Sequence, residues 1–367
     1  MNLSVGIVGL PNVGKSTLFN ALLKKQQALA ANYPFATIEP NVGAVPVPDA
    51  RLIKLAELTM EEEKMAALPP LKPAIIEFVD IAGLVKGASE GAGLGNKFLS
   101  HIREVKIIAH VVRAFEDADV IKEGAVDPKA DYEVIRAELI IADLQTVEKQ
   151  RDSKAVKTDP VKKSAIEKLY KGLNEGISAY NIVLTDDERA TLRDMFLLSN
   201  KPEIIVLNVS EDQYTPEGIA EVTKKFGELL GMHDADIVVI CAKIESELAA
   251  LSDDEAKEYL GDLGLTTSGL ERLIQKAYNK LDLISFLTAG EKEVKAWTVA
   301  KDIDAPNAAG AIHTDFTKKF IKAEVIAFDD YVATGGRKKA KEVGKARLEG
   351  RDYIVKDGDV IEFKIGA

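Results

Sequence analysis

The stretch "GLPNVGKST" (residues 9–17) decides the fold of this chain. It fits the pattern G-x-x-x-x-G-K-[ST], in which a glycine-rich loop between a strand and a helix wraps its backbone N–H groups around phosphates. The run before it, "SVGIVG" (4–9), is apolar and typical of a buried strand. We therefore expect a nucleotide site between the first strand and the first helix.

The polar residues of this loop have distinct expected roles. Gly14 lets the backbone come close to the phosphates, Lys15 would pair with the β- and γ-phosphates, and the Ser16 hydroxyl would bind Mg²⁺. The alternative is a chance glycine turn, which the further motifs argue against. Nucleotide contacts are expected from Asn12, Val13, Gly14, Lys15, Ser16 and Thr17.

A second motif follows another apolar run, "AIIEFVD" (74–80). Asp80 would hold the Mg²⁺ shell and the Gly83 N–H would meet the γ-phosphate, although an Asp is also an ordinary residue at a strand end. Thr37 would supply a hydroxyl to the same ion. The glycine-rich stretch "GASEGAGLGNKF" (87–98) can change shape, which suits a γ-phosphate sensor or a passive linker.

The spacing of the apolar runs predicts a doubly wound α/β sheet. The runs are short and continuous, and helix-like segments lie between most of them, as in sheets of buried parallel strands. The run "NVGAVPVP" (41–48) suits the edge of the sheet, because proline cannot donate a backbone hydrogen bond. The other strands are expected within 74–80, 105–115, 203–209 and 236–242.

Residues 129–200 depart from this alternation because they hold no strand-like run. Their apolar residues recur every three or four positions, which is the stripe of an amphipathic helix. We predict a helical hairpin inserted into the α/β domain; the alternative is part of a larger helical layer. The two stripes run through Ile135, Leu139, Ala142 and Thr146, and through Ile166, Leu169, Leu173, Ile177 and Tyr180.

The last region is strand-rich again and is expected to form a separate α+β domain. A helix is expected over 308–321. The stretch "DYIVKDGDVIEFKI" (352–365) has the alternating pattern of a β-hairpin around Asp357-Gly358. The expected domain ranges are 1–128 with 201–282 for the nucleotide-binding domain, 129–200 for the insert, and 283–367 for the third domain.

The composition is that of a globular chain. Among 367 residues, 46% are hydrophobic and 29% are charged, and no apolar run approaches the roughly 18 residues that a membrane span needs. The single cysteine, Cys241, rules out an internal disulfide framework and fits a reducing compartment. We expect no signal peptide, a cytoplasmic location and a monomer.

The motifs taken together resemble those of the Obg-like ATPase family, YchF subgroup. "NYPFATIEPN", "FVDIAGLVKGASEGAGLGNKFL", "NVSE", "CAKIE" and "YIVKDGDV" follow the phosphate loop in the family's order, over essentially the whole chain. Two departures, Ala114 for a frequent Cys and the missing His of "VIKEG" (120–124), do not touch the nucleotide motifs. The resemblance implies a P-loop NTPase domain of the Obg type, a coiled-coil insert and a C-terminal β-grasp-like TGS domain.

The loop "NVSE" (208–211) stands where guanine-reading enzymes usually have Asn-Lys-x-Asp. Asn208 can bond to N6 and N7 of adenine, whereas Val209 lacks the lysine stem that packs over the base and Glu211 displaces the carboxylate that guanine needs. The residues permit adenine without proving it. The resemblance implies ATP over GTP, with the Val209 backbone near the base. The other side of the base would be closed by Cys241, Ala242 and Lys243.

Hydrolysis is expected to be slow. Many P-loop hydrolases place a glutamine after D-x-x-G to orient the attacking water, and Leu84 stands there instead. Asn12 resembles positions that bind K⁺ in related enzymes without that glutamine, so stimulation by K⁺ is a hypothesis. His110, in an apolar strand, is a candidate catalytic residue that would orient water, and equally a candidate for a satisfied core histidine.

Two basic segments lie in a chain of net charge −11. Residues 149–171 hold eight Lys/Arg and three Asp/Glu, and residues 337–351 hold seven and two, a net of +5 each. Such surfaces on an acidic body suit a large polyanion, although charge runs are also ordinary solvated faces. The resemblance implies a ribosome, bound through these segments in a nucleotide-dependent manner.

Three functions are compatible with these residues. The leading hypothesis is an Mg²⁺-dependent ATPase switch that acts with ribosomes in translation or stress regulation. The second is a GTPase of the Obg type. The third is a nucleotide-gated binding module in which turnover is incidental, because Leu84 offers no group to orient water.

Overall fold

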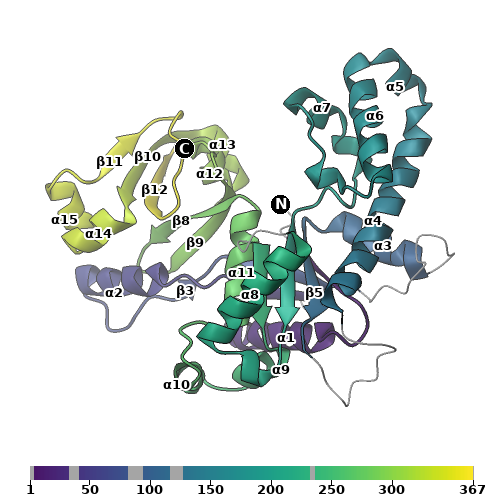
Figure 1. Ribbon diagram of the computed structural model, residues 1–367. Helices are drawn as coiled ribbons and strands as arrows, with labels where there is room; N and C mark the ends of the chain where they lie inside the picture. The colour runs from purple at the N-terminus through teal and green to yellow at the C-terminus, as the bar shows by residue number, and fades with distance from the viewer. Residues whose placement is uncertain (1–3, 33–40, 82–93, 116–126, 232–235, 367) are drawn as a thin grey trace. The chain divides into compact units, whose positions relative to one another are not determined.

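The computed structural model describes residues 4–32, 41–81, 94–115, 127–231 and 236–366. It comprises two compact units, one of Met1–Val45 and Glu77–Leu273 and one of Pro46–Ile76 and Ile274–Ala367, each built on its own sheet (Figure 1). Within the described ranges, no helix combines the length and the apolar character that crossing a membrane requires.

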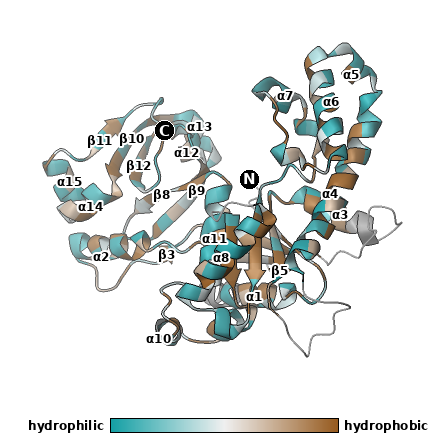
Figure 2. Ribbon diagram, viewed as in Figure 1, coloured by the Kyte–Doolittle hydropathy of each residue, from teal (hydrophilic) through white to brown (hydrophobic). Residues whose placement is uncertain are grey.

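The first unit contains six strands: β1 (Ser4–Val8), β2 (Val42–Pro46), β4 (Ile75–Asp80), β5 (Ile107–Arg113), β6 (Glu203–Asn208) and β7 (Ile237–Ile240). Their order in the sheet is β2-β4-β1-β5-β6-β7. The pairs β1–β4, β1–β5, β5–β6 and β6–β7 are parallel, and β1, β5 and β7 are buried along their whole length. Figure 2 shows hydrophobic residues concentrated on strands of this sheet. The predicted parallel sheet, with the proline-containing strand at its edge, is confirmed.

Helices pack on this sheet through the apolar faces that the sequence periodicity supplies. The helices outside the insert are α1 (Lys15–Asn32), α3 (Leu94–Glu104), α8 (Pro216–Leu230), α9 (Ala242–Leu248), α10 (Asp253–Asp262) and α11 (Gly269–Lys280), with a 3-10 turn η3 (Glu211–Gln213). Ile102 of α3 packs with Val8 and Ile108 of β1 and β5. Phe226 of α8 packs with β6 and β7. These contacts hold the strand ends, and the loops that follow them, in a fixed arrangement.

The insert between β5 and β6 is helical. It contains α4 (Pro128–Arg151), α5 (Lys154–Thr158), α6 (Pro160–Asn174) and α7 (Asp186–Thr191), with 3-10 turns η1 (Ala179–Asn181) and η2 (Arg193–Met195). The first half of α4 packs on the sheet through Ile135, and its second half packs on α6 through Val147 and Ile166. The predicted stripe is wrong at its end, because α6 stops at Asn174 and Tyr180 lies beyond it, its N–H donating to Ser199 O.

The second unit has a mixed six-stranded sheet in the order β11-β10-β12-β8-β9-β3. Its strands are β3 (Leu71–Lys72), β8 (Leu283–Ala289), β9 (Val294–Ala300), β10 (Phe320–Ala327), β11 (Arg347–Glu349) and β12 (Asp359–Ile365). The pairs β8–β9, β10–β11 and β10–β12 are antiparallel, whereas β12–β8 and β3–β9 are parallel. The helices of this unit are α2 (Arg51–Glu63), α12 (Ala305–Gly310), α13 (Thr314–Lys319), α14 (Phe328–Thr334) and α15 (Arg337–Glu342).

Residues 46–76 differ from the expected domain ranges, which placed them with the nucleotide-binding domain. In the structure they belong to the same compact unit as residues 274–367. β3 forms the edge of the second sheet beside β9, and Arg51 of α2 donates to Asp357 at 2.7 Å. A two-residue strand is too short to have a periodic pattern, so this association could not be predicted from the sequence.

Two local predictions in the second unit are wrong. The helix expected over 308–321 is two short helices, because His313 takes an extended backbone and caps α13 by accepting from Asp315 N. The hairpin expected over 352–365 has only its second strand, β12. The carboxylate of Asp357 instead accepts from Ser285 N at 2.8 Å, which ties the turn to β8.

Candidate nucleotide site

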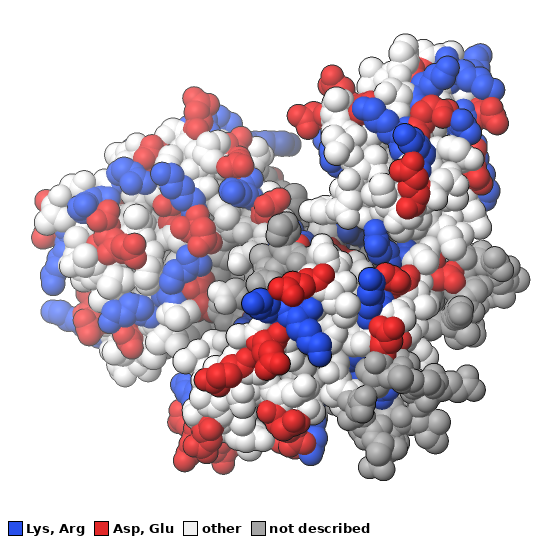
Figure 3. Space-filling model, viewed as in Figure 1, with Lys and Arg blue, Asp and Glu red and all other residues white. Residues whose placement is uncertain are grey.

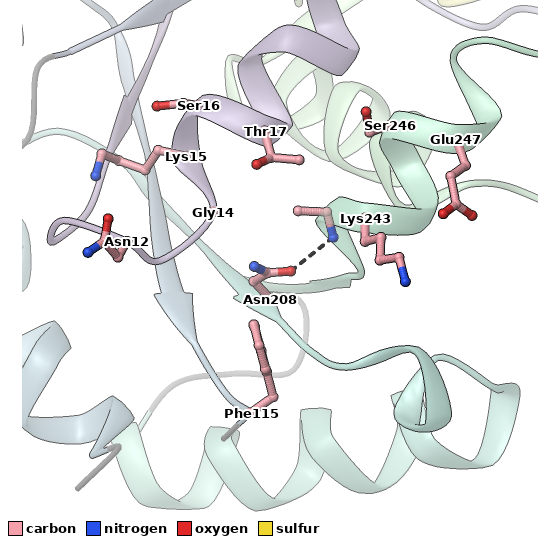
Figure 4. A pocket seen from close by; sticks show the side chains of 11 residues that line it. Asn12, Gly14, Lys15, Ser16, Thr17, Phe115, Asn208, Lys243, Ser246 and Glu247 are labelled. Carbon is pink, nitrogen blue, oxygen red and sulfur yellow. Dashed lines mark hydrogen bonds between the residues drawn. The ribbon is translucent and has the colours of Figure 1, made fainter. Parts of the chain in front are cut away.

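A cavity of about 850 Å³ lies where the phosphate loop meets the carboxyl ends of β5, β6 and β7 (Figure 4). Ligands of open α/β sheets bind at this edge, outside the carboxyl ends of the strands. Eight predicted nucleotide-site residues line it: Asn12, Gly14, Lys15, Ser16, Thr17, Asn208, Ala242 and Lys243. Three further lining residues are Phe115, Ser246 and Glu247.

The phosphate loop holds two residues in left-handed backbone conformations. Asn12 has φ 61° and Gly14 has φ 100°. The helix α1 begins directly afterwards at Lys15, so its first N–H groups point toward the cavity end of the loop. The Lys15 ammonium donates to Leu10 O at 2.6 Å and is almost fully buried. The loop is thus already shaped, and its ammonium is held by a carbonyl that a phosphate could replace.

The charges of Lys15 and Asp80 interact at the phosphate loop, although Asp80 is not among the cavity-lining residues. Burial lowers the pKa of the Lys15 ammonium, and the charge of Asp80 acts in the opposite direction. Burial raises the pKa of the Asp80 carboxyl, and the charge of Lys15 again acts oppositely. Both charges are costly to bury and each reduces the cost of the other. A polyphosphate with a cation would satisfy both.

Asn208 connects two loops of the cavity. Its Nδ2 donates to Val13 O at 3.0 Å, and its Oδ1 accepts from Ala242 N at 2.9 Å, the bond drawn in Figure 4. The side chain is 4% exposed, so both bonds are made away from water. An amide has two N–H donors and two oxygen lone pairs, so one of each is left for a ligand.

The residues that flank Asn208 do not all face the cavity. Val209 and Cys241 are buried in the core between β6, β7 and α8, and the Val209 N–H donates to Ile240 O. Glu211 lies on η3 and forms an ion pair with Lys243, whose pKa the carboxylate raises. The predicted contacts of Val209, Glu211 and Cys241 with the base are therefore not among the cavity-lining contacts, whereas Ala242 and Lys243 are.

Sequence reasoning missed three lining residues that positional signals could have found. Phe115 lies two residues past the end of β5, at the same sheet edge as the phosphate loop and Asn208. Ser246 and Glu247 lie three and four positions after Lys243 on α9, which is one helical turn. Phe115 supplies the large apolar face that a base needs for stacking.

His110 has a structural environment. It is 1% exposed, and its Nδ1 lies 2.8 Å from Oε1 of Glu203, whose Oε2 accepts from Tyr132 at 3.0 Å. The ring packs on Tyr132 with centroids 5.0 Å apart. It is not among the cavity-lining residues. Of the two roles that the sequence left open, this environment favours the satisfied core histidine.

The oxygen groups at the site are chemically suited to Mg²⁺. Ser16 lines the cavity, and Asp80 ends β4 beside Lys15. A hydroxyl and a carboxylate are hard oxygen ligands of the kind that Mg²⁺ uses together with phosphates and waters. Thr37, Gly83 and Leu84 lie outside the described residues. Among the residues that the structure does describe, no three His, Cys, Asp or Glu side chains form a metal cluster.

Comparison with known proteins gives matches over the whole chain. The "Ribosome-binding ATPase YchF" of Bacillus subtilis is 48% identical over 371 residues, and that of Escherichia coli O157:H7 is 45% identical over 370, each covering 99% of both chains. The structure of the Schizosaccharomyces pombe YchF GTPase matches with a TM-score of 0.85 and 36% identity, covering 99% of this chain and 98% of that one.

Two family models match parts of the chain. The model described as "50S ribosome-binding GTPase" matches residues 4–142, which include the phosphate loop and Asp80. The model YchF-GTPase_C, described as "Protein of unknown function (DUF933)", matches residues 283–366, the strand-rich end of the second unit. The phosphate loop, the cavity and the full-length matches of 45–48% identity together show that the chain belongs to the YchF family of P-loop nucleoside triphosphatases.

Proposed function

We propose that this chain binds ATP and Mg²⁺ in the cavity, hydrolyses the ATP slowly, and associates with ribosomes in a nucleotide-dependent manner. The observation that carries the proposal is the buried Lys15 ammonium, held by Leu10 O at the mouth of a preformed phosphate loop beside the Asp80 carboxylate. The function rests on this chemistry and on relatives named as ribosome-binding ATPases.

The phosphate end of the ligand would take the place of the Leu10 carbonyl. An ammonium that moves from one neutral carbonyl to anionic phosphate oxygens exchanges a bond with one charged partner for bonds in which donor and acceptor are both charged, which adds Coulomb attraction. Ser16 and Asp80, with Thr37 from the segment 33–40, would hold Mg²⁺, and the Gly83 N–H would contact the γ-phosphate. Mg²⁺ would supply positive charge between the β- and γ-phosphates.

The base end favours adenine over guanine. The free N–H and lone pair of Asn208 match N7 and N6–H₂ of adenine, whereas guanine offers two acceptors, N7 and O6, at the same edge. A guanine-reading enzyme has an Asp at the position of Glu211, and its carboxylate accepts from N1 and N2 of guanine. Here the Glu211 carboxylate is instead paired with Lys243. Phe115 would stack on the base from the open side of the cavity.

A monovalent cation would complete the phosphate site. The left-handed turn at Asn12 points its side chain into the cavity, and a K⁺ bound there would stabilise charge that develops between the phosphates. Leu84 cannot orient water, so turnover would depend on this ion or on a partner. The rate of ATP hydrolysis should therefore be higher in KCl than in NaCl, and equal rates would contradict a role for K⁺.

The ion pairs of the two basic segments support the first segment as the main ribosome contact. In the second segment, residues 337–351, five of the seven Lys/Arg side chains pair with carboxylates. In the first, residues 149–171, three of eight do so. The five that make no ion pair with a described residue are Lys149, Lys154, Lys162, Lys163 and Lys171. We assign the main ribosome contact to this end of the insert, where Lys and Arg gather in Figure 3.

The rest of the proposal follows the family. The insert would act as a coiled-coil arm, the residues around 283–366 as a β-grasp-like TGS domain, and the chain as a cytoplasmic monomer that acts in translation or stress regulation. The names of relatives differ on the nucleotide, because the fission-yeast structure is titled a GTPase. A GTPase is therefore the second candidate, and a nucleotide-gated module with incidental turnover is the third.

Nucleotide competition with measured turnover tests all three. ATP and GTP would be titrated against a fluorescent ADP with Mg²⁺, with and without ribosomes, on wild-type chain and Lys15→Ala. We expect ATP to compete better than GTP, turnover to rise with ribosomes, and Lys15→Ala to lose binding. A preference for GTP would overturn the base assignment. A variant that binds ATP without turnover, yet replaces the wild-type protein in cells, would favour the nucleotide-gated module.

A further inference from the structure

A second cavity lies in the first unit, where the insert rejoins the sheet. Its volume is about 410 Å³, and its lining includes Lys106, which precedes β5, and Lys201, which precedes β6. Because these strands are parallel, the cavity lies at the amino-end edge of the sheet, opposite the edge that holds the nucleotide cavity. The other walls come from the insert, from α6 and from the segment of α7 and η2.

Four cations line this cavity: Lys106, Arg189, Arg193 and Lys201. Within the described chain, no carboxylate shares the lining, and the side chains of Lys106, Arg189 and Arg193 form no ion pair. No ion pair offsets the charge of these three side chains, unlike those of the basic segment at residues 337–351, and Asp143 acts on Lys201 from outside the lining. An anion bound here would meet several donors that are already in place.

Lys201 is the most enclosed of the four. Its ammonium donates to Val105 O and to Arg103 O, which lies 3.1 Å away, so it braces the end of the insert against the chain before β5. Burial lowers the pKa of Lys201 to about 8, and Lys106 acts in the same direction while Asp143 opposes it. The unliganded cavity thus holds two ammonium groups that repel each other, and an anion would relieve this repulsion.

Phe196 gives the cavity an aromatic wall with an unusual backbone. It has φ 48°, a left-handed conformation that bulky residues rarely adopt and that a glycine would adopt without strain. Its ring is nevertheless 65% exposed beside the cations. The left-handed backbone of Phe196 ends the 3-10 turn η2, but this C-cap position does not require a large apolar side chain. Core packing does not explain the exposed ring either, and backbone outliers gather at ligand sites.

We propose that this cavity binds one unpaired nucleotide of an RNA strand, with the base stacked on Phe196 and the flanking phosphates on Arg189, Arg193 and Lys106. The proposal deepens the proposed ribosome association and rests on it. Sequence-independent binding of single strands combines these two elements, a cationic groove for the backbone and aromatic faces for the bases.

The chemistry favours RNA over an acidic peptide. A planar guanidinium binds two oxygens of one phosphate at once, and two arginines with a lysine match the successive charges of a sugar–phosphate chain. A peptide carboxylate would use the cations but would leave the exposed ring of Phe196 without a stacking partner. The volume also falls within the range of roughly 300–1,000 Å³ that holds small ligands. Paired bases, in contrast, have no free face to stack.

The test uses the full chain with ADP in the nucleotide cavity and a short fluorescein-labelled oligouridylate as the probe. Phe196→Gly removes the ring and relieves the backbone strain, so it should fold at least as well as the wild type. We expect it to bind the probe roughly 5- to 100-fold more weakly, the range of a lost base–aromatic stack. The double variant R189Q/R193Q should weaken binding and lower the slope of log affinity against log salt by about 1.4, since two phosphate contacts are lost.

A matched control removes two exposed charges elsewhere on the same unit. K224Q/K225Q, on α8, carries the same change in net charge and should bind the probe like the wild type. Wild-type affinity in Phe196→Gly would overturn the proposal. Equal competition by duplex RNA or by oligoglutamate would also overturn it, because neither offers a free base.

Two further measurements separate this proposal from the proposed function. ATP binding by Phe196→Gly and by R189Q/R193Q should equal that of the wild type, since the two cavities lie at opposite sheet edges. Wild-type chain that sediments with ribosomes yet does not bind the oligouridylate would refute this cavity alone. Wild-type chain that binds the oligouridylate but neither ATP nor ribosomes would refute the proposed function and keep the cavity.

Discussion

The backbone of Gly14 and the side chain of Asn208 lie directly against each other. A Cβ atom on Gly14 would stand 2.3 Å from Nδ2 of Asn208, closer than two such atoms can approach. The same amide holds Val13 O and Ala242 N. Glycine is therefore required at position 14 for two reasons. Its φ of 100° is unfavourable for other residues, and Asn208 occupies the space that a Cβ atom would need.

Gly14→Ala should lose nucleotide affinity without unfolding the unit. Either Asn208 must move or the loop must open, and backbone strain of this kind costs about 1–3 kcal/mol. We expect ADP and ATP to bind about tenfold more weakly or worse, measured by isothermal titration calorimetry. Gly176→Ala is the control, because it has φ 75° but meets nothing within 4 Å. Unchanged affinity in Gly14→Ala would show that Asn208 does not limit the loop.

Asn208→Ala should loosen the link between the phosphate loop and α9. It leaves Val13 O and Ala242 N without partners in a buried place, at a cost of about 1–3 kcal/mol for each group. Hydrogen exchange at the Ala242 amide should become faster, and the urea midpoint of the first unit should fall. Asn174→Ala removes one exposed bond to Tyr170 O and should change stability by less than about 0.5 kcal/mol. A protected Ala242 amide in Asn208→Ala would contradict this role.

The parts of the site that could be predicted from the sequence are those formed by a contiguous motif. The phosphate loop needs a strand, a glycine and a helix start within one short stretch, and Gly14, Lys15 and Ser16 lie where that pattern places them. Phe115 was missed because it belongs to no motif and reaches the cavity only because β5 runs parallel to β1. Such residues become visible once strand order is known.

Several of the errors share one physical cause, which is that long-range pairs override local preference. Asp357-Gly358 has the composition of a hairpin turn, but the Asp357 carboxylate binds Arg51 and Ser285. Glu211 looks like a base-reading carboxylate displaced by one methylene, but it pairs with Lys243 across the chain. A count of charged residues in the sequence does not include such partners. It therefore overstated the positive charge that the second basic segment, residues 337–351, has available for a ligand.

The variant V209K/E211D rebuilds the Asn-Lys-x-Asp sequence and should shift the preference toward GTP. The shorter carboxylate would leave Lys243 for N1 and N2 of guanine, and the lysine at position 209 would turn its stem out of the core, where Val209 is buried, to lie over the base. We expect the ratio of GTP to ATP affinity to rise about tenfold, which corresponds to one gained hydrogen-bonded group. Competition binding measures it, with Glu211→Gln as the control that removes the charge alone. A ratio equal to that of the control would place base selection elsewhere in the cavity.

Glu188 should make the insert sensitive to acid. Lys168, the Thr185 N–H and the Ser164 hydroxyl lower the pKa of this carboxyl from 4.5 to about 2. Since the folded pKa lies below the unfolded one, the stabilisation is complete above pH 4.5 and is lost as the pH falls from 4.5 toward 2.

Thermal unfolding of wild type and Glu188→Gln at pH 7 and near pH 3 measures this effect. The midpoint difference between the two proteins should be large at pH 7 and should shrink near pH 3, where the wild-type carboxyl begins to protonate. Glu175→Gln, an exposed carboxylate near the end of α6, serves as the control. A Glu188→Gln difference that stays constant with pH would assign the loss to packing instead of charge.

Charge reversal should separate the two basic segments in ribosome binding. Lys162 and Lys163 lie in the first turn of α6 and make no ion pair with a described residue. The variant K162E/K163E would therefore repel the phosphates of the ribosome without breaking an ion pair within the described part of the chain. Glutamates also suit the first turn of a helix, which keeps the fold intact. We expect co-sedimentation with ribosomes to weaken at least about tenfold at moderate salt, because two cations that neutralise phosphates become anions. Lys339→Glu changes a position of the second segment that makes no ion pair with a described residue and should have a small effect, as should K224E/K225E on α8. If Lys339→Glu abolished binding while K162E/K163E did not, the contact would belong to the second segment despite its ion pairs, and the assignment to the insert would be wrong.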